Sequence, residues 1–337
     1  MRKKKATVYD VAERANVSVS TVSRYLNRTS YIVKEKVDAI EKAIVDVNFT
    51  PKTTQSSAKT KRNMTLGVIS PAFDSPFISE ILGGVYSEAV KTSYKLELEA
   101  SNWDQNRERK IIKQLITQKV DGLILLVPTL DIKEIKQLVG NTPVLFIARD
   151  GGSSYPSLLI DNQMGGYIAT NHLIQLGHKE IVFVTGTEGS LDGAERFIGY
   201  KQSLENAGIE FNSNLVIDGA YESQKAFDSM SELIEQGASF SAVFCANDTS
   251  AYGVIQALHQ KDIQVPAQVS VVGFDDLSTS QFFIPRLTTI KQPLHCLGQI
   301  SIKHMLDLIS SNTPEYVIPP VTLVERDSCI AAMELCE

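Results

Sequence analysis

Apolar residues near the start of the chain recur at the spacing of a helix face. The first set is Val8, Val11, Ala12 and Ala15. Thr7 precedes this set and is a residue type that caps helices, so we expect a first helix over residues 8 to 15. Asn16 can adopt the left-handed conformation of a tight turn, and Ser18 can cap a second helix that runs to about Asn27. The pattern therefore predicts two short helices that cross at a turn.

The second predicted helix has an apolar face and a polar face. Val22 and Leu26 face inward, and the outward positions are Val19, Ser20, Ser23 and Arg24. Short polar groups with one arginine suit the major groove of DNA. A third helix, within KEKVDAIEKAIVDV, closes the core with Val37, Ile40, Ile44 and Val47. We expect a helix-turn-helix, and the alternative is a three-helix cap with a solvated basic face, because this spacing also gives false matches.

From residue 65 the pattern changes to short apolar runs that alternate with longer helical segments. The runs are LGVI, GLILLV, VLFIA, IVFVT, AVFCA and VSVVGF, and each is typical of a strand buried on both faces of a parallel sheet. The helical segments include FISEILGGVYSEAV, RERKIIKQLI, GGYIATNHLIQL, RFIGYKQSLENA and SAYGVIQALHQK. Repeated strand-helix units predict an α/β fold with doubly wound parallel sheets. The length favours two lobes of similar fold over one large sheet.

Charge is divided unevenly along the 337 residues, which are enough for a small and a larger domain. Residues 1 to 62 carry 14 Lys or Arg against 6 Asp or Glu, a net charge of +8, and the remainder of the chain carries −14. A basic head on an acidic body is typical of a domain that docks on a polyanion such as nucleic acid. Hydrophobic residues at 43% and charged residues at 21% indicate an ordinary globular protein.

Several other function classes have little support in the sequence. No apolar run approaches the roughly 18 residues that cross a bilayer, and MRKKKATVYD lacks the core of a signal peptide, so we expect a cytoplasmic protein without membrane contact. The four cysteines form no CxxC pair and the five histidines lack metal-ligand spacing, so we expect no metal and no cofactor. HExxH, GxSxG, GxxxxGK[ST] and GxGxxG motifs are absent, so we expect no catalytic residues and no enzyme.

Three separated segments occur in a familiar order: YDVAERANVSVSTVSRYLN, then NFTPKTTQSSAKTKRNMTLGVI, then IPRLTTIKQP. In these the chain resembles the lactose-repressor (LacI/GalR) family of transcription regulators, from about residue 6 to residue 330. The resemblance implies a sequence-specific DNA-binding repressor of a carbohydrate-utilisation operon. A small sugar or sugar phosphate between two periplasmic-binding-protein-like lobes would control it allosterically. A palindromic double-stranded operator needs two recognition helices at a fixed spacing, so we expect a homodimer.

The resemblance also implies domain boundaries and DNA contacts. The expected boundaries are 1–48 for the helix-turn-helix domain, 49–63 for a hinge, and 64–337 for the effector-binding and dimerisation domain, with lobe 1 near 64–161 plus 292–323 and lobe 2 near 162–291 plus 324–337. By position in the family's motif, Val19, Ser20 and Arg24 touch base edges. The expected phosphate contacts come from Thr7, Ser18, Thr21, Ser23 and Asn27.

Two departures from the family pattern bear on DNA binding. The segment RTSYIVKEKV is shorter than the family's loop and lacks its Ser-x-x-Thr-Arg helix start. The hinge has Gln55, Ser56 and Ala58 where the family has Ala, Arg and Leu. Leucine is the wedge that opens a minor-groove step, and a methyl group has little to insert. We predict a weaker DNA kink, or a hinge that depends on hydrogen bonds from Gln55 and Ser57; the alternative is a flexible linker over residues 52 to 63.

Polar and aromatic side chains follow the carboxyl ends of the predicted strands, where α/β folds of this kind bind ligands. The candidate effector-binding residues are Asp74, Ser75, Phe77, Ser190, Asp192, Arg196, Tyr221, Asn247 and Asp275. Planar donors and acceptors with an aromatic ring suit a sugar, because they bond neighbouring hydroxyls and stack on its CH face. The resemblance implies that Arg196, Asn247 and Asp275 hold the family's effector positions and that Tyr221 lines the pocket.

Each of these residues also has a plainer interpretation. Arg196 and Asp275 would form an ion pair between the lobes, Phe77 and Tyr221 would be core rings, and Asn247 would cap a helix. Capping is the interpretation that we favour for Asp248, which follows Asn247. Ala148 replaces an Asp that is frequent in the family, so one hydroxyl contact is missing or is moved to Asp150.

The effector class is partly constrained by the same residues. Purine-binding relatives place an Arg and a Thr where this chain has Ser190 and Asp192, so we favour a sugar. Arg196 is the one evident cation at the strand ends, with Arg149 nearby, which favours a neutral sugar over a phosphorylated one. The alternatives are a sugar-binding protein without specific operator binding, including a receptor of the periplasmic type, and a carbohydrate-modifying enzyme built on scattered carboxylates such as Asp161. None of these explains the basic head.

Overall fold

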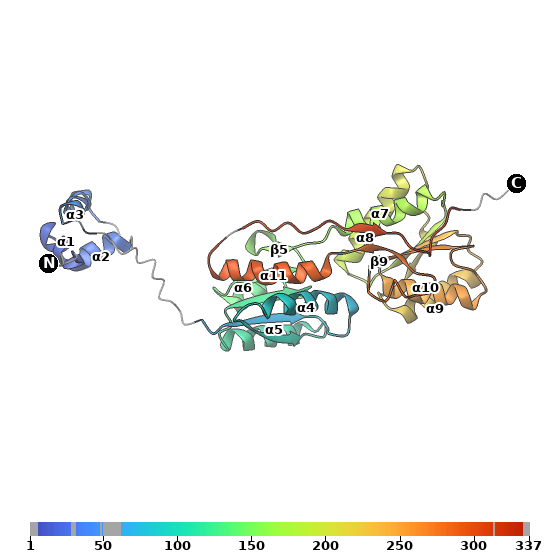
Figure 1. Ribbon diagram of the computed structural model, residues 1–337, viewed down its shortest axis with the longest axis horizontal. Coiled ribbons are helices and arrows are strands. Elements are labelled where there is room, and N and C mark those ends of the chain that lie inside the picture. The colour runs from blue at the N-terminus through green and yellow to red at the C-terminus, as the bar shows by residue number, and fades with distance from the viewer. Residues whose placement is uncertain (1–5, 28–31, 48, 50–61, 313, 333–337) are drawn as a thin grey trace. The chain divides into compact units, whose positions relative to one another are not determined.

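The structure, a computed structural model, describes residues 6–27, 32–47, 49, 62–312 and 314–332. It divides into two compact units, residues 1–62 and 63–337, which we call the head and the body (Figure 1). The expected hinge falls almost entirely on residues 50–61, which lie outside the described part of the chain, as do Gln55 and Ala58. Within the described residues, no helix combines the length and the apolar composition that a membrane crossing requires.

The head consists of α1 (Val8–Arg14), α2 (Val19–Asn27) and α3 (Lys34–Asp46). Its buried core is made of Val11, Ala12, Val22, Ile40 and Ala43. The predicted helices therefore form, but α3 contributes Ala43 in place of Val37, which stays half-exposed. Val37 lies in the first turn of α3, at the margin of a core that is too small to cover the whole helix. Ile44 and Val47 pack against the edge of this core.

The body contains two sheets with the same strand order. Sheet A runs β2-β1-β3-β4-β5, and sheet B runs β7-β6-β8-β9-β10 with β11 added beyond β10. The strands of sheet A are β1 (Thr65–Ser70), β2 (Lys95–Ala100), β3 (Gly122–Leu126), β4 (Val144–Ile147) and β5 (Ser157–Leu158). Those of sheet B are β6 (Ile181–Thr185), β7 (Val216–Asp218), β8 (Ala242–Cys245), β9 (Ser270–Asp275), β10 (Thr288–Lys291) and β11 (Thr322–Val324). All pairings are parallel except that of β10 with β11, so the predicted fold class is confirmed.

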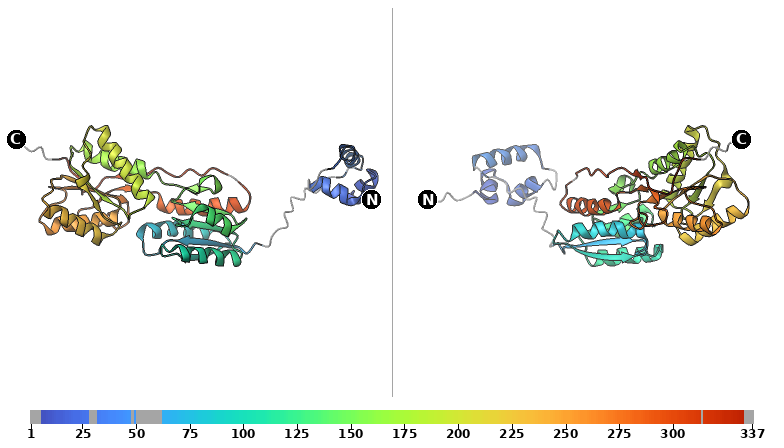
Figure 2. Two further views of the ribbon diagram at one scale, coloured as in Figure 1. Left: turned by 180° about the vertical axis from the view of Figure 1, so that it is seen from behind. Right: turned by 45° about the vertical axis from the view of Figure 1, so that its right-hand side comes forward.

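Helices cover both faces of each sheet (Figures 1 and 2). The helices are α4 (Pro76–Ala89), α5 (Gln105–Thr117), α6 (Ile132–Val139), α7 (Asn162–Gln175), α8 (Leu191–Asn206), α9 (Ser223–Glu235), α10 (Asp248–Gln260) and α11 (Leu294–Ile309), with short 3-10 turns η1 (Gly152–Ser154) and η2 (Ser213–Leu215). In β3, Leu123 and Leu125 pack toward α5 and α6, whereas Ile124 and Leu126 pack toward α4 and α11. A strand covered on both faces has no polar positions, which is why this run is apolar throughout.

The sequence pattern did not predict the strands that lack a long apolar run, and it also missed some helices. β2 has the sequence KLELEA and mostly exposed side chains, because it is an edge strand. β5 and β7 have only 2 and 3 residues. The helices α6, α9 and α11 were also not predicted. Lobe 1 is sheet A with α4, α5, α6 and α11, and lobe 2 is sheet B with α7, α8, α9 and α10.

The chain returns to lobe 2 earlier than expected. Thr322 and Leu323 already pair with β10 in sheet B, whereas we placed the crossing after residue 323. Within lobe 1, α4 and α11 approach closely at Gly84, where a Cβ would lie 2.0 Å from the carbonyl oxygen of His295. Only glycine permits this contact, which packs α4, the helix that follows β1, against α11.

Candidate functional site

The first turn of α1 is held by its own capping residues. The Asp10 carboxylate accepts hydrogen bonds from the backbone N–H of Thr7 (2.6 Å) and from its hydroxyl (2.7 Å). The Arg14 guanidinium donates to the Asp46 carboxylate at 2.6 Å and joins α1 to α3. Thr7 is thus the N-cap residue of α1, as predicted, and its hydroxyl donates a hydrogen bond to the Asp10 carboxylate.

The turn into α2 has the predicted geometry. Asn16 has φ of +50°, and the Ser18 hydroxyl accepts from the Thr21 N–H at 3.2 Å. The Ser18 hydroxyl also bonds the hydroxyls of Ser20 (2.8 Å) and Thr21 (2.7 Å), so these small groups form one polar cluster at the start of α2. Such a cluster at a helix N-terminus suits an anion, because unpaired backbone N–H groups lie there.

The outward face of α2 carries most of the predicted base-contacting groups. Ser20, Ser23 and Arg24 are exposed, and Val22 is fully buried. Val19 is less exposed than predicted, since it is half-buried and packs against the head core; its contact with a base stays a prediction. Asn27 ends α2, but its side chain lies outside the described part of the chain, and so does the shortened loop at residues 28–31.

In the body, a buried guanidinium lies at the centre of the predicted effector residues. Arg196 is only 3% exposed, and its Nε donates to the Asn162 Oδ1 at 3.0 Å. One Nη donates to the carbonyl of Ala246, directly after β8, at 2.5 Å. The guanidinium also lies 3.8 Å from the centre of the Phe274 ring and 5.8 Å from that of Tyr221. These contacts fix the plane of the guanidinium, as bidentate recognition of a ligand requires.

Asp275 ends β9 next to this guanidinium. Its carboxylate lies 4.0 Å from an Arg196 Nη and accepts from the Gln292 amide at 2.5 Å. The pKa of the Asp275 carboxyl is raised to about 8, mainly by burial; the Asp248 carboxylate also raises it, whereas Arg196 and the bond from Gln292 lower it. Both charged residues belong to lobe 2, so the interpretation of Arg196 and Asp275 as an ion pair between the lobes is wrong. The backbone φ of Asp275 is +116°, a strained value for a side-chain-bearing residue at such a site.

Tyr221 is seated beside the guanidinium by a glycine. A Cβ on Gly186 would lie 2.1 Å from the Tyr221 Cζ, so only glycine leaves room for the ring. The phenol and the Ser190 hydroxyl are 3.1 Å apart and form a hydrogen bond. Burial raises the pKa of Tyr221, while Arg196 and the bond to Ser190 lower it. Tyr221 therefore remains a neutral, hydrogen-bonded ring at this edge of sheet B.

Two adjacent residues after β8 have different roles. The Asn247 Oδ1 caps α10 by accepting from the Ser250 N–H (2.9 Å), and its amide donates to the carbonyl of Tyr221 (3.2 Å). The Asp248 carboxylate accepts from the Leu277 N–H (2.8 Å) and the Ser280 hydroxyl (2.6 Å), and also from the Thr289 hydroxyl. Capping was thus the wrong interpretation of Asp248, which ties the loop after β9 to α10. Burial raises its pKa to about 6.

The remaining predicted residues divide between the lobes. Ser190 caps α8 by accepting from the Gly193 N–H at 3.2 Å. Asp192 accepts from the Asn162 amide at 3.3 Å, and burial raises its pKa against the opposing effect of Arg196. The lobe-1 residues are Asp74, Ser75 and Phe77, which follow β1 at the start of α4. Among the described residues, no hydrogen bond or ion pair joins these three to the residues around Arg196 in lobe 2, which we call the Arg196 cluster.

Sequence reasoning missed three residues of the cluster. Asn162 holds both Arg196 and Asp192, Gln292 holds Asp275, and the Phe274 ring stacks on the guanidinium. Each lies near the carboxyl end of a strand, in IDN, KQP and GFDD, so inspection of every strand end would have included them.

Two further residues near the strand ends of lobe 1 have local roles. Asp150 is exposed and accepts from the Gly152 N–H at 2.7 Å. The Arg149 guanidinium donates to the carbonyls of Pro128 and Leu130.

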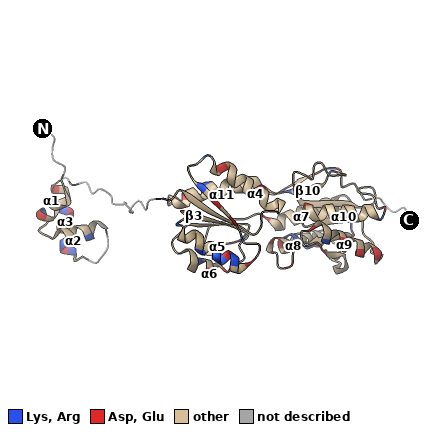
Figure 3. Cartoon of the chain, turned by 90° about the horizontal axis from the view of Figure 1, so that it is seen from below, with Lys and Arg blue, Asp and Glu red and all other residues tan. Residues whose placement is uncertain are grey.

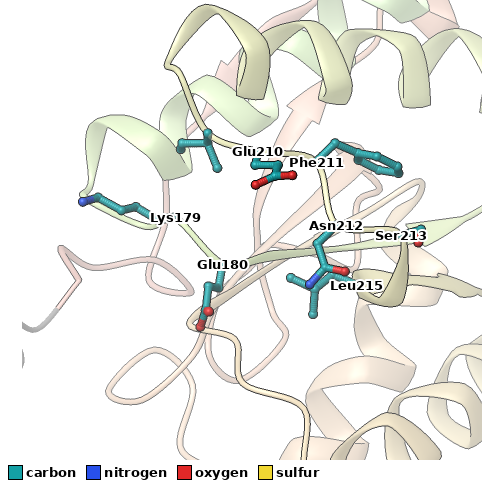
Figure 4. A pocket seen from close by; sticks show the side chains of 8 residues that line it. Lys179, Glu180, Glu210, Phe211, Asn212, Ser213 and Leu215 are labelled. Carbon is teal, nitrogen blue, oxygen red and sulfur yellow. The ribbon is translucent and has the colours of Figure 1, made fainter.

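A surface pocket in lobe 2 lies apart from this cluster (Figure 4). It is lined by Lys179, Glu180, Ile209, Glu210, Phe211, Asn212, Ser213 and Leu215. Lys179 and Glu180 directly precede β6, so the pocket is at the amino ends of the strands, whereas the predicted residues follow the carboxyl ends. Among the described residues, no group of His, Cys, Asp or Glu is arranged to hold a metal ion.

Comparisons with known proteins cover both units of the chain. A family model described as bacterial regulatory proteins, lacI family, matches residues 7–52, and one described as periplasmic binding proteins and sugar binding domain of LacI family matches residues 63–327. The HTH-type transcriptional repressor PurR of Pectobacterium carotovorum subsp. carotovorum is 31% identical over 329 residues, which are 96% of each chain.

Solved structures give the same likeness. The lac repressor dimer bound to operator and the anti-inducer ONPF has 28% identity and a TM-score of 0.73, over 97% of this chain and all (100%) of that one. The transcriptional regulator CelR in complex with cellobiose has 27% identity and a TM-score of 0.71, over 96% of this chain and 100% of that one. The similarity therefore extends from the head through both lobes.

Proposed function

The chain belongs to the lacI family of bacterial regulatory proteins, and from this premise we propose that it is a homodimeric, cytoplasmic repressor of a carbohydrate-utilisation operon. It binds a palindromic operator through α2 and is controlled by a small sugar bound at the Arg196 cluster. The family assignment, with relatives that are transcriptional repressors, bears out the expectation that the protein is a regulator and not an enzyme.

The observation that carries the DNA-binding proposal is the exposed face of α2. Ser20, Ser23 and Arg24 project from a helix whose opposite side is anchored by the fully buried Val22. An arginine forks onto guanine, and a serine hydroxyl bonds several bases. The net charge of +8 over residues 1 to 62 adds a sequence-independent attraction to phosphates. Figure 3 marks the charged residues of the three helices of the head.

A neutral carbohydrate is the effector class that the cluster in lobe 2 suits best. Arg196, Asn247 and Asp275 offer planar donors and acceptors beside the Tyr221 ring. Arg196 already donates to two protein oxygens, and Arg149 donates to two backbone carbonyls. The carboxyl groups of Asp192 and Asp275 also lie near Arg196 and repel a phosphate when they are ionised, which supports an uncharged sugar over a sugar phosphate.

Control of DNA binding requires that the sugar prefers one arrangement of the body over another. A ligand that binds two states equally shifts no equilibrium, however tightly it binds. The strand ends of lobe 1, with Asp74, Ser75 and Phe77, supply contacts that a ligand held on lobe 2 would gain in only one arrangement. The change would reach the operator through the segment between head and body.

The test is selection of operator sequences from a pool of random duplex DNA, followed by titration of sugars and purine bases against the selected sequence. We expect a palindrome whose affinity changes with one sugar. Arg24→Ala should weaken specific DNA binding by about 1 to 3 kcal/mol and leave sugar binding intact, and Asp275→Ala should do the reverse. Selection without sequence preference, a response to purines only, or two variants that do not separate the activities would contradict the proposal.

A further inference from the structure

The two lobes repeat one arrangement around their edge strands. β2 and β7 occupy the same place in the two sheets, each paired in parallel with the strand that opens its lobe, β1 or β6. Each edge strand leads through a short turn into a helix of 13 residues, α5 after β2 and α9 after β7. The turns can therefore be compared residue by residue.

The same hydrogen bonds hold both turns. After β2, the Ser101 N–H donates to the Ser70 carbonyl of β1 at 2.9 Å, and the Asp104 N–H donates back to the Ser101 carbonyl at 3.1 Å. After β7, the Gly219 N–H donates to the Thr185 carbonyl of β6 at 3.2 Å, and the Glu222 N–H donates to the Gly219 carbonyl at 2.8 Å. Ser101 thus corresponds to Gly219, and the two residues that follow each of them correspond as well.

Those two residues have the same unusual backbone in both lobes. Asn102 and Trp103 have φ of +55° and +58°, and Ala220 and Tyr221 have φ of +48° and +61°. Bulky residues rarely adopt positive φ, and such strain persists only where surrounding bonds enforce it. Trp103 is therefore the counterpart in lobe 1 of Tyr221, the aromatic ring of the candidate effector site.

A difference between two corresponding residues of the lobes explains why the two rings differ in exposure. Gly186 follows Thr185, and the Tyr221 ring fills the space where a Cβ would be. The corresponding residue after Ser70 is Pro71, whose buried side chain occupies that position in lobe 1. The indole of Trp103 is left outside and is 60% exposed. It is held on a rigid turn, because the Asp104 carboxylate also caps α5.

We propose that Trp103 is a second stacking platform and that the effector is a carbohydrate of at least two rings. This rests on the proposed function of the Arg196 cluster. One ring is bound by Arg196, Asn247 and Asp275 against Tyr221 in lobe 2. The second ring places its CH face on the exposed indole of Trp103, because a flat aromatic face without a charged partner favours apolar CH groups over further hydroxyls.

The test compares full-length wild type with Trp103→Ala and Trp103→Phe by calorimetric titration of neutral mono- and disaccharides. For a disaccharide that binds wild type, Trp103→Ala should lower affinity by about tenfold, and Trp103→Phe should retain most of it. Affinity for a component monosaccharide and for operator DNA should not change. Equal losses for mono- and disaccharide, or no loss for either, would overturn the assignment of Trp103 while leaving a sugar-binding site intact. If no carbohydrate bound wild type, the proposed effector class itself would fail.

Fluorescence gives an independent readout, because Trp103 is the only tryptophan of the chain. Binding of the disaccharide should shift its emission to shorter wavelength and protect it from iodide quenching. A monosaccharide should do neither. Protection that follows protein concentration instead of sugar would identify a second copy of the chain as the group that covers Trp103, and would overturn the proposal.

Discussion

The raised pKa of Asp275 makes a quantitative prediction about pH. The carboxyl is buried, and burial together with the nearby Asp248 carboxylate raises its pKa to about 8 against the lowering effect of Arg196. The ionised carboxylate accepts hydrogen bonds from sugar hydroxyls at both oxygens and more strongly than the protonated acid, which uses one oxygen as a donor. Arg196, 4.0 Å away, also favours the ionised form. Sugar affinity should therefore rise with pH as Asp275 loses its proton.

The magnitude follows from the fraction of ionised Asp275. With a pKa of about 8, roughly nine tenths of the carboxyl is ionised at pH 9 and about one hundredth at pH 6. In the limit where only the ionised form binds, sugar affinity is about ninetyfold weaker at pH 6 than at pH 9, and the direction of the change is the same for any weaker preference. The same shift predicts that the free energy of unfolding falls as pH rises toward 8. The folded protein still holds this proton there, whereas the unfolded chain, with an ordinary carboxyl pKa, has already lost it.

The assay is calorimetric titration of one neutral sugar across this pH range. Asp275→Asn should bind weakly and with little dependence on pH, because it keeps the shape of the acid and cannot ionise. Asp276→Asn is the matched control, since it removes the neighbouring carboxylate, which pairs with Arg326 at the margin of the site, and should keep the wild-type profile. A wild-type affinity that is flat with pH, or an unchanged profile in Asp275→Asn, would refute the reasoning.

Three further substitutions test the packing around the site. Gly186→Ala should weaken sugar binding without unfolding the protein, because the new Cβ would lie 2.1 Å from the Tyr221 ring and must displace it; calorimetry with circular dichroism separates the two effects. Gly84→Ala should lower the midpoint of thermal unfolding, because its Cβ would lie 2.0 Å from a carbonyl oxygen of α11. An unchanged midpoint would contradict the argument that this close helix contact stabilises the body. His178→Ala should destabilise the body by about 2 kcal/mol in urea unfolding, because the buried ring bonds the hydroxyls of Ser241 (2.9 Å) and Ser270 (3.0 Å) and lies 3.1 Å from the Ile330 carbonyl. A change near zero would contradict this role.

The local pattern of the sequence predicted most of the elements. Helix spacing identified the head, and uninterrupted apolar runs identified the six central strands, because each of these strands is covered on both faces. The pattern failed at the edges. β2 alternates polar and apolar residues because one side of it is exposed, and its KLELEA does not resemble a buried strand. The exposure of Val19 and the burial of Val37 were both overestimated for a related reason, since the small core of the head decides how much of each terminal turn is covered.

Residue types at strand ends also predicted the candidate site in outline. Arg196, Tyr221, Asn247 and Asp275 were all named from sequence and are joined by contacts in the structure. The sequence could not show which residues are hydrogen-bond partners within one lobe. Arg196 bonds Asn162, 34 residues away, and Asp248 bonds Thr289, 41 residues away.

The sequence by itself determined that the chain has a basic helical head and an acidic α/β body, because charge and hydrophobic spacing act over a few residues. Only the tertiary structure decided that Asp248 ties a loop, that burial raises the pKa of Asp275, and that Trp103 repeats the position of Tyr221. These depend on burial and on strand order. Both bring together residues that are far apart in the chain, and local spacing does not encode such contacts.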